Sequence, residues 1–237
     1  MPADSGEHDG AIPLTSMLKG CLSDVHNDGT LTIREIFMQH TVCLTGPALP
    51  ESFYWFHEPP EFHFADGLHL HTRGNTDFWQ RTHYGFRRDD GHCLFTRVTG
   101  NFALMCHVAF TPCNQYDQCG LMVRVDPDHW IKISTEYENP EISRLGSVVT
   151  NGGYSDWATR DVPATIMEMW YRITREGDDY SIGHSSNGRE WSQMRVTHLH
   201  GGAKTVEAGI YACSPKGDGF RCHFRTLSME TPDPAPK

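Results

Sequence analysis

Polar and aromatic side chains able to bind a ligand alternate with apolar ones along residues 114–138, NQYDQCGLMVRVDPDHWIKISTEYE. Alternation along a strand over residues 118–125 puts Gln118 and Arg124 on one face. Alternation over residues 130–137 likewise groups Trp130, Lys132 and Glu136. Planar polar groups hydrogen-bond sugar hydroxyls, and an indole ring stacks on the apolar face of a pyranose. The pattern predicts a site for a carbohydrate or a related polar small molecule. The alternative is a solvated face with cross-strand ion pairs.

Two further tryptophans extend the candidate ligand-binding set. Trp79 and Trp157 each lie close to an acidic residue in the sequence, Asp77 and Asp156 respectively. The rings would supply stacking platforms at the border of the site, and the carboxylates would accept hydrogen bonds from hydroxyl groups. The structural alternative is core packing, the commoner role of a tryptophan in a β-sandwich.

A glycoside-active enzyme is the competing hypothesis. Glycosidases use two carboxyl groups, separated by roughly 5–5.5 Å for retention or ~6.5–9.5 Å for inversion. The conditional catalytic candidate is Glu136, with Asp156 or Asp77 as its partner. Glu136 would act as acid/base or nucleophile. The sequence does not decide between binding and catalysis.

No metal or other cofactor is predicted. His69 and His71 are two residues apart and share a strand face, as do His198 and His200, so an imidazole pair is geometrically possible at either place. A chain with 15 histidines contains such pairs by composition alone. The sequence identifies no third ligand for either pair.

These side chains depend on a central β-hairpin whose opposite face is apolar. The turn is predicted at residues 126–129, where Pro127 fits a turn and would interrupt a strand ladder. More than ten short strand patterns, separated by glycine, asparagine and aspartate turns, follow from about residue 52. The fold class is therefore all-β, with two stacked antiparallel sheets. The apolar face of the hairpin comprises Cys119, Leu121, Val123 and Val125 on the first strand and Ile131 and Ile133 on the second.

The chain is divided into three parts. Residues 1–50 are expected to form a partly disordered N-terminal extension, in which Thr32–Thr41 has the pattern of a short amphipathic helix. Residues 51–230 are expected to form the sandwich domain. Residues 231–237 are a proline-rich tail that is expected to be disordered.

Composition excludes some partners. A formal net charge of −10, without a basic stripe, argues against binding to nucleic acids or anionic membranes. No apolar stretch is long enough to span a bilayer. Eight cysteines occur without a C-x-x-C motif, and the N-terminus lacks the apolar segment of a signal peptide. We therefore expect reduced thiols and a cytoplasmic location.

Five sequence segments, taken together, resemble those of a known family. The chain is similar to the domain of unknown function 1349, also called the regulation-of-enolase family, within the concanavalin A-like lectin/glucanase superfamily. The resemblance covers roughly residues 52–229 and implies a jelly-roll sandwich whose concave face binds the ligand. The segments are TDFWQRTHYGF at 76–86, NQYDQCGLMVR at 114–124, WIKISTEYE at 130–138, SVVTNGGYSDW at 147–157 and YACSPKGDGF at 211–220.

The resemblance adds a third functional class. The family name implies a regulatory protein that binds a protein partner of central carbon metabolism. The glucanases of the superfamily carry a run similar to Glu-x-Asp-x-x-Glu on one strand, and the sequence contains no such run. Binding of a carbohydrate or polar small molecule is the function we expect first.

Overall fold

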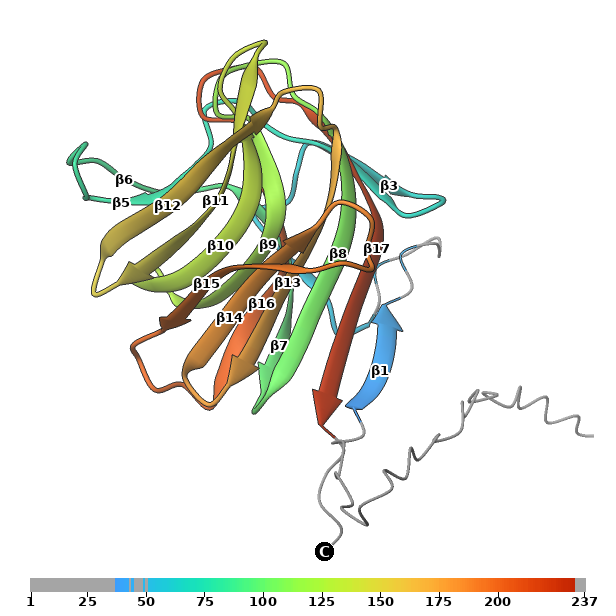
Figure 1. The fold of residues 1–237 in the computed structure, drawn as a ribbon, viewed down its shortest axis with the longest axis vertical. Coiled ribbons are helices and arrows are strands. Elements are labelled where there is room, and N and C mark those ends of the chain that lie inside the picture. The colour runs from blue at the N-terminus through green and yellow to red at the C-terminus, as the bar shows by residue number, and fades with distance from the viewer. Residues whose placement is uncertain (1–36, 43, 45–48, 50, 233–237) are drawn as a thin grey trace, which may run out of the picture. The chain divides into compact units, whose positions relative to one another are not determined.

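A computed structural model describes residues 37–42, 44, 49 and 51–232. Two large antiparallel sheets and one two-stranded sheet account for its strands (Figure 1). The eight-stranded sheet has the order β15-β14-β13-β8-β17-β4-β3, with β1 also paired to β17. Its strands are β1 (Phe37–Val42), β3 (Glu61–Phe64), β4 (Leu68–His71), β8 (Phe102–Thr111), β13 (Glu168–Glu176), β14 (Asp179–Ser185), β15 (Ser192–His198) and β17 (Arg221–Pro232).

The seven-stranded sheet has the order β12-β11-β10-β9-β16-β7-β2, and β5 pairs separately with β6. The predicted central hairpin is confirmed, because β9 ends at Asp126 and β10 begins at His129. The strands of these sheets are β2 (Tyr54–Phe56), β5 (Phe78–Gln80), β6 (Arg87–Asp89), β7 (His92–Thr99), β9 (Gln118–Asp126), β10 (His129–Tyr137), β11 (Ile142–Asn151), β12 (Tyr154–Pro163) and β16 (Thr205–Cys213).

The main core lies between the two large sheets. Leu121 of β9 and Ile133 of β10 belong to the same buried cluster as Leu104 of β8 and Phe224 of β17. The period-two alternation therefore places the apolar side of the central hairpin in the core, as predicted. The predicted all-β jelly-roll sandwich is confirmed.

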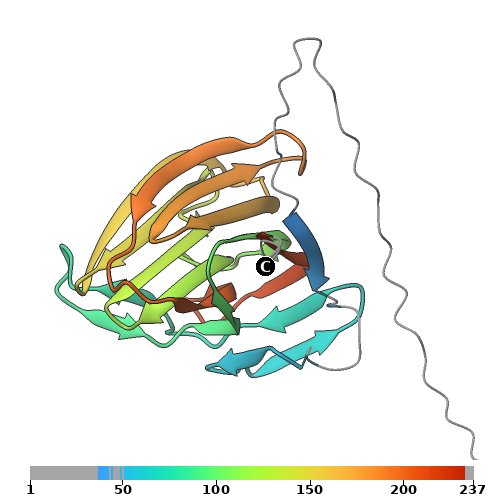
Figure 2. The same cartoon turned by 90° about the horizontal axis from the view of Figure 1, so that it is seen from below.

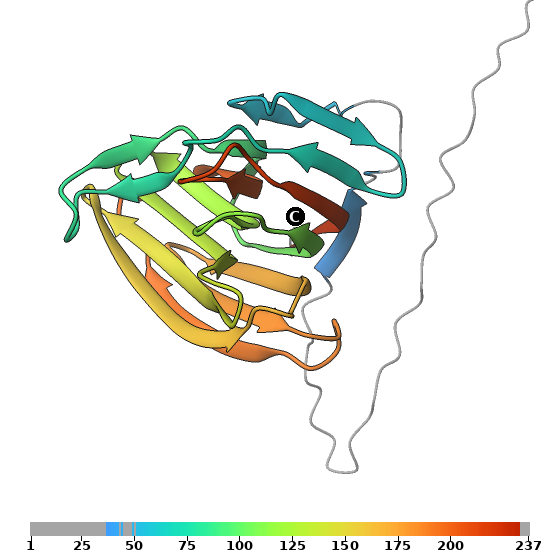
Figure 3. The same ribbon diagram turned by 90° about the horizontal axis from the view of Figure 1, so that it is seen from above.

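A second buried cluster covers the outer face of the seven-stranded sheet, the face directed away from the eight-stranded sheet. Trp130 and Tyr211 of that sheet pack there with Phe78 of β5. Figures 2 and 3 show the β5–β6 hairpin well separated from β13–β15. A small β-hairpin thus shields part of a sheet face that would otherwise be open to water.

The helix predicted over Thr32–Thr41 is wrong for its second half. Residues 37–42 form β1, which pairs with β17 from Phe37 opposite Pro232 to Val42 opposite Leu227. Residues 32–36 lie outside the described residues. Pairing with β17 gives the backbone N–H and C=O groups of this segment the hydrogen bonds that a helix would form internally. A short apolar pattern in the sequence does not distinguish a strand from a helix.

The strands of the sandwich extend beyond residues 51–230, the range expected from the sequence, at both ends. β1 adds residues 37–42 to the eight-stranded sheet, and β17 continues to Pro232. The rest of the predicted extension and tail, apart from residues 44 and 49, lies outside the described residues. In the part of the chain that the structure describes, no helix is long and apolar enough to cross a membrane.

Candidate functional site

Three polar side chains from β9 and β10 form a hydrogen-bonded chain on the outer face of the seven-stranded sheet. Gln118 lies opposite Glu136 in the strand register, and its amide nitrogen donates to Glu136 Oε2 at 2.6 Å. The amide oxygen of Gln118 accepts from Lys132 Nζ at 2.9 Å and from the Tyr211 hydroxyl at 3.1 Å. Alternation explains the grouping, because Lys132 and Glu136 are four residues apart on one strand.

Lys132 is nearly inaccessible, with 4% of its side chain exposed. Its ammonium also donates to the backbone oxygen of Phe78 in β5 at 2.9 Å and lies 3.8 Å from Asp77 Oδ1. A buried charge is tolerated only where polar partners replace water. Lys132 therefore holds the β5–β6 hairpin against the sheet. It also belongs to the hydrogen-bonded group of Gln118, Lys132 and Glu136, which we call the polar set.

Glu136 has an unusual ionisation. Part of the residue reaches solvent, but its carboxyl lies among protein atoms, and this burial raises the pKa of Glu136 to about 8. The charge of Lys132 opposes the increase, whereas the charges of Asp77 and Glu138 reinforce it. The carboxyl is therefore largely protonated at pH 7 and can donate a hydrogen bond. Among the described residues, only Gln118 donates a hydrogen bond to it.

Asp77 supplies the second carboxyl group near this set. Its Oδ1 accepts from the backbone nitrogen of Phe78 at 2.7 Å and faces Lys132 Nζ at 3.8 Å. The side chain is 17% exposed. Asp77 thus remains accessible from solvent beside the buried ammonium.

Aromatic side chains of the β5–β6 hairpin rise beside the polar set. The Trp79 indole nitrogen donates to the Thr82 backbone oxygen at 3.0 Å, which fixes the ring against the loop 81–86. Tyr84 lies next to Trp79, with ring centroids 5.6 Å apart, and stacks on Phe86 at 5.9 Å. Tyr84 and Phe86 are 58% and 43% exposed. Large exposed aromatic rings beside buried polar groups are typical of a ligand site.

Two further aromatic residues, from other parts of the chain, lie near the same polar side chains. Trp157 of β12 is partly exposed. Tyr116 precedes β9 with a left-handed backbone, φ 75°, and Lys216 Nζ lies 4.6 Å from its ring centroid. Burial raises the pKa of the Tyr116 hydroxyl, and the charges of Glu138 and Glu136 add to the shift. The phenol is therefore protonated at neutral pH.

These groups enclose a cavity of about 480 Å³ between the β5–β6 hairpin and the outer face of the seven-stranded sheet. We call it the hairpin pocket. Its size is within the range of small-molecule sites. It is lined by Asp77, Trp79, Tyr84, Phe86, Arg88, Tyr116, Gln118, Lys132, Glu136, Val148, Trp157, Pro215 and Lys216.

The structure brings six of the sequence-predicted site residues together in this pocket: Asp77, Trp79, Gln118, Lys132, Glu136 and Trp157. It does not place Arg124 there. The Arg124 guanidinium pairs with Asp89 at 2.8 Å and Glu207 at 3.5 Å, and it lies 4.6 Å from the Phe56 ring centroid. Arg124 therefore supports the contact between β6 and the sheet.

Trp130 and Asp156 also lie outside the pocket lining. Trp130 is completely buried, and its indole nitrogen donates to the Pro127 backbone oxygen at 3.1 Å, so it presents no ring face to solvent. The Asp156 side chain is 72% exposed and pairs with Arg195 of β15. Neither can contact a ligand in the hairpin pocket without rearrangement.

Sequence reasoning missed several lining residues. Tyr84 and Phe86 flank Gly85 in a loop. Two aromatic residues beside a glycine in a loop have no core to pack into, and this pattern could have identified them as candidate binding residues. Tyr116 and Lys216 gave no comparable signal, because they depend on loops far apart in the sequence. The other missed residues are Arg88, Val148 and Pro215.

The fold and the pocket define a β-sandwich protein with an aromatic-walled cavity on the outer face of one sheet. The chain belongs to the family described as "Protein of unknown function (DUF1349)", whose sequence profile matches residues 55–232. It is similar to "Regulation of enolase protein 1" of Saccharomyces cerevisiae, with 34% identity over 179 residues, 75% of this chain and 89% of the relative. The family resemblance recognised in the sequence is confirmed.

Solved structures agree on the fold. A functionally unknown protein from Saccharomyces cerevisiae matches with a TM-score of 0.71 and 32% identity, covering 78% of this chain and 98% of that chain. A xylan beta-1,4-xylosidase from Bacillus halodurans matches with a TM-score of 0.64 and 13% identity, covering 88% of this chain and 41% of that chain. At such low identity, the second similarity concerns the sandwich fold alone.

Proposed function

We propose that the chain binds a neutral carbohydrate, or a related uncharged polyhydroxy compound, in the hairpin pocket. The observation that carries the proposal is the hydrogen-bonded set of Lys132, Gln118 and Glu136 at the base of a cavity walled by aromatic rings. Sugars offer an apolar ring face for stacking and hydroxyl groups for fixed donors and acceptors. The hairpin pocket offers both kinds of contact within about 480 Å³.

Charge balance favours an uncharged ligand. Lys132 faces Asp77, and Arg88 pairs with Asp90 at 2.9 Å. Glu136 is largely protonated at pH 7 because its pKa is raised to about 8. The base of the pocket therefore carries little uncompensated charge, and a charged ligand there would lose hydration without gaining a full counter-charge. Lys216, an exposed residue of the lining that donates to Gln115 Oε1 at 2.7 Å, has no carboxylate partner among the described residues.

A protein with a similar fold supports the carbohydrate proposal by analogy. Among the structurally similar proteins is the xylan beta-1,4-xylosidase described above, whose name indicates that it acts on xylan. The similarity covers 41% of that protein and says nothing of its site. It makes short xylo-oligosaccharides a sensible first probe.

The test is isothermal titration of the full chain with a panel of neutral oligosaccharides, beginning with xylotriose and including cello- and arabino-oligosaccharides. We expect saturable heat from at least one sugar. Trp157→Ala should weaken that binding about two- to tenfold, because an aromatic contact contributes about 0.5–1.5 kcal/mol. Absence of saturable binding across the panel would reject the proposal.

Trp191→Ala provides the matched control. Trp191 is also partly exposed, but its ring lies under the Arg172 guanidinium at 4.4 Å, outside the hairpin pocket lining. Its loss should leave sugar affinity unchanged. Equal weakening in both variants would indicate a general effect on folding and count against the assignment of the site.

Glycoside hydrolysis is the second candidate, and the pKa of Glu136 favours it. A carboxylic acid that stays protonated near neutral pH is what a glycosidase requires as general acid, and Asp77 is the second carboxyl in the same pocket. Glu136→Gln would then reduce turnover by ~10²–10⁴-fold while retaining sugar binding. Turnover by the wild type on a glycoside panel would replace the binding proposal with this one.

A regulatory role through a protein partner is supported by the name of the yeast relative, "Regulation of enolase protein 1". The exposed rings of Tyr84 and Phe86 offer a surface for such a partner.

A cytoplasmic location accords with this role. The six cysteines in the described part of the chain are free, and five of them are buried. Buried free thiols suit a reducing compartment.

A further inference from the structure

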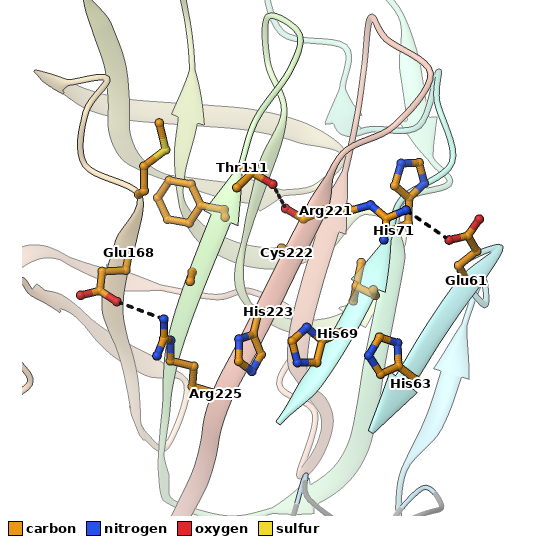
Figure 4. Close-up of a pocket in the computed structure, with 14 residues that line it drawn as sticks. Glu61, His63, His69, His71, Thr111, Glu168, Arg221, Cys222, His223 and Arg225 are labelled. Carbon is orange, nitrogen blue, oxygen red and sulfur yellow. Dashed lines mark hydrogen bonds and ion pairs between the residues drawn. The ribbon is translucent and has the colours of Figure 1, made fainter. Parts of the chain in front are cut away.

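Three histidines form a row across neighbouring strands of the eight-stranded sheet. His63 of β3 lies opposite His69 of β4, and His69 lies opposite His223 of β17 (Figure 4). The flanking residues Leu68 and Phe224 are buried in the main core. Because successive side chains alternate across a strand, the three histidines lie on the opposite, outer face of this sheet.

The rings are close together. Centroids of His63 and His69 are 4.7 Å apart and those of His69 and His223 are 3.7 Å apart, with nearly parallel planes. The turn between β3 and β4 adds Asp66, whose Oδ1 is 2.8 Å from His69 Nε2 and 3.6 Å from His223 Nε2. The ligand atoms of Asp66, His69 and His223 all lie within 4.8 Å of one another.

We propose that Asp66, His69 and His223 bind a divalent transition-metal ion, of which Zn²⁺ is the representative, with water completing the coordination. Two imidazole nitrogens and a carboxylate oxygen are a ligand set that suits zinc and disfavours calcium or magnesium. Three protein ligands and one solvent position make an open tetrahedral site.

The spacing is close to what the ion requires. Metal–ligand distances of about 2.0–2.2 Å place tetrahedral ligand atoms about 3.3 Å apart. The observed separations from Asp66 Oδ1, 2.8 Å and 3.6 Å, lie on either side of that value. The two stacked rings must turn so that both nitrogens point at one ion, and the terminal torsion of histidine is broad enough to permit it.

The surroundings are compatible with an ion. The side chains of His69 and His223 are 33% and 16% exposed and that of Asp66 is 76% exposed, so the site lies at the surface and is open to solvent. Gly67 leaves room beside it, since a Cβ there would lie 2.8 Å from His223 Nε2. Above its ordinary pKa, histidine is neutral and offers a lone pair. A hydrogen-bonded histidine stack without metal is the alternative that the experiment must exclude.

Metal binding would join distant parts of the chain. Asp66 and His69 belong to the β3–β4 hairpin at one edge of the sheet, whereas His223 lies in β17, more than 150 residues later. Bound metal would fasten this edge hairpin to the sheet and stabilise the folded chain. The site is on the other sheet from the hairpin pocket and does not depend on the proposed carbohydrate function.

The test is titration of the full chain, without an affinity tag, with Zn²⁺ at pH 7.5 by calorimetry, with thermal melting in parallel. We expect one site of approximately unit stoichiometry and a higher Tm with metal. His69→Asn and His223→Asn should each weaken Zn²⁺ binding at least about tenfold and abolish the increase in Tm. Both variants should retain the wild-type far-ultraviolet spectrum, which confirms that they fold.

His71→Asn is the matched control, because His71 lies on the same strand and face as His69 but outside the ligand cluster. It should bind Zn²⁺ like the wild type. His198→Asn serves as a second control, since His198 and His200 form another surface pair. Binding that persists in His69→Asn, or that disappears in either control, would overturn the proposal. A wild-type affinity no tighter than that of His223→Asn would do the same.

Discussion

The ammonium of Lys132 lies 2.9 Å from the amide oxygen of Gln118, and both side chains are almost completely buried beneath the hairpin pocket. Because that oxygen accepts from a cation, the amide nitrogen of Gln118 must point the other way, toward Glu136. The orientation of one amide therefore links a buried positive charge to a carboxyl group with a raised pKa. Ligand hydroxyl groups would meet a fixed arrangement rather than mobile side chains.

Lys132→Met should destabilise the protein. The substitution removes the side-chain donor to the Phe78 backbone oxygen and leaves the Gln118 amide oxygen with the Tyr211 hydroxyl as its one remaining donor. We expect a loss of about 2 kcal/mol in the free energy of unfolding, measured by urea denaturation. Lys216→Met, at an exposed lysine of the same pocket, should change stability by less than about 0.5 kcal/mol. Equal stabilities would show that Lys132 has no role in holding the β5–β6 hairpin.

The raised pKa of Glu136 predicts a stability that declines with increasing pH. The pKa is near 4.5 in the unfolded chain and about 8 in the folded one, so between these values only the folded chain keeps the proton. The free energy of unfolding should therefore fall from about pH 4.5 to about pH 8 and then level off, by an amount of the order of a few kcal/mol. Urea denaturation at pH 5, 6, 7 and 8 measures this slope.

Glu136→Gln tests the origin of that slope. The new amide oxygen can still accept from Gln118, but the proton-linked term disappears, so the decline attributable to Glu136 should vanish. Glu176→Gln, at an exposed position on β13, should leave the wild-type slope intact. A variant with an undiminished slope would assign the pH dependence to other groups.

Arg124→Ala should affect stability rather than ligand binding. The side chain is 9% exposed and its guanidinium pairs with Asp89 and Glu207, so truncation leaves two partly buried carboxylates without their cation. We expect a loss of about 3 kcal/mol. Arg97→Ala, at an exposed arginine 6.0 Å from the Tyr54 ring centroid, should cost less than about 1 kcal/mol. Thermal melting with and without the sugar separates the two effects, and lost affinity with unchanged Tm would contradict this role.

The central hairpin could be predicted because its information is local. Alternation alone identified the core positions of β9 and β10, and it placed Gln118 and Glu136 on a common face. It could not show which residues of that face meet solvent. Trp130 and Arg124 share the face but are covered from β5 and β6 by Phe78 and Asp89. This cover comes from contacts between segments 35 to 54 residues apart, which strand periodicity does not encode.

The histidine row illustrates the same limit. A pair separated by two residues, His69 and His71, is visible in the sequence, but the structure groups His69 with His223 instead. Register between β4 and β17 decides that grouping, and it depends on the whole sheet. The second half of the helix predicted at Thr32–Thr41 is wrong for a related reason, because residues 37–42 pair with β17, a strand partner that no local pattern reveals.

Tyr84→Ala should weaken binding of whichever neutral sugar the wild type binds, with little effect on folding. Tyr84 is 58% exposed, and its ring lines the hairpin pocket beside Trp79. The loop is held by its backbone, since Arg81 nitrogen donates to Phe86 oxygen at 2.8 Å and Gly85 nitrogen donates to Arg81 oxygen at 2.7 Å. Removing the ring should therefore leave the loop in place and change stability by less than about 0.5 kcal/mol.

Tyr154→Ala is the control for this loop prediction. Tyr154 is 61% exposed, lies 5.4 Å from the Arg81 guanidinium and is not part of the hairpin pocket lining. Calorimetric titration should show about two- to tenfold weaker sugar binding for Tyr84→Ala and wild-type affinity for Tyr154→Ala. If the two variants bind the sugar equally well, the loop 81–86 does not contact the ligand, and the polar set of Lys132, Gln118 and Glu136 must hold it without this wall.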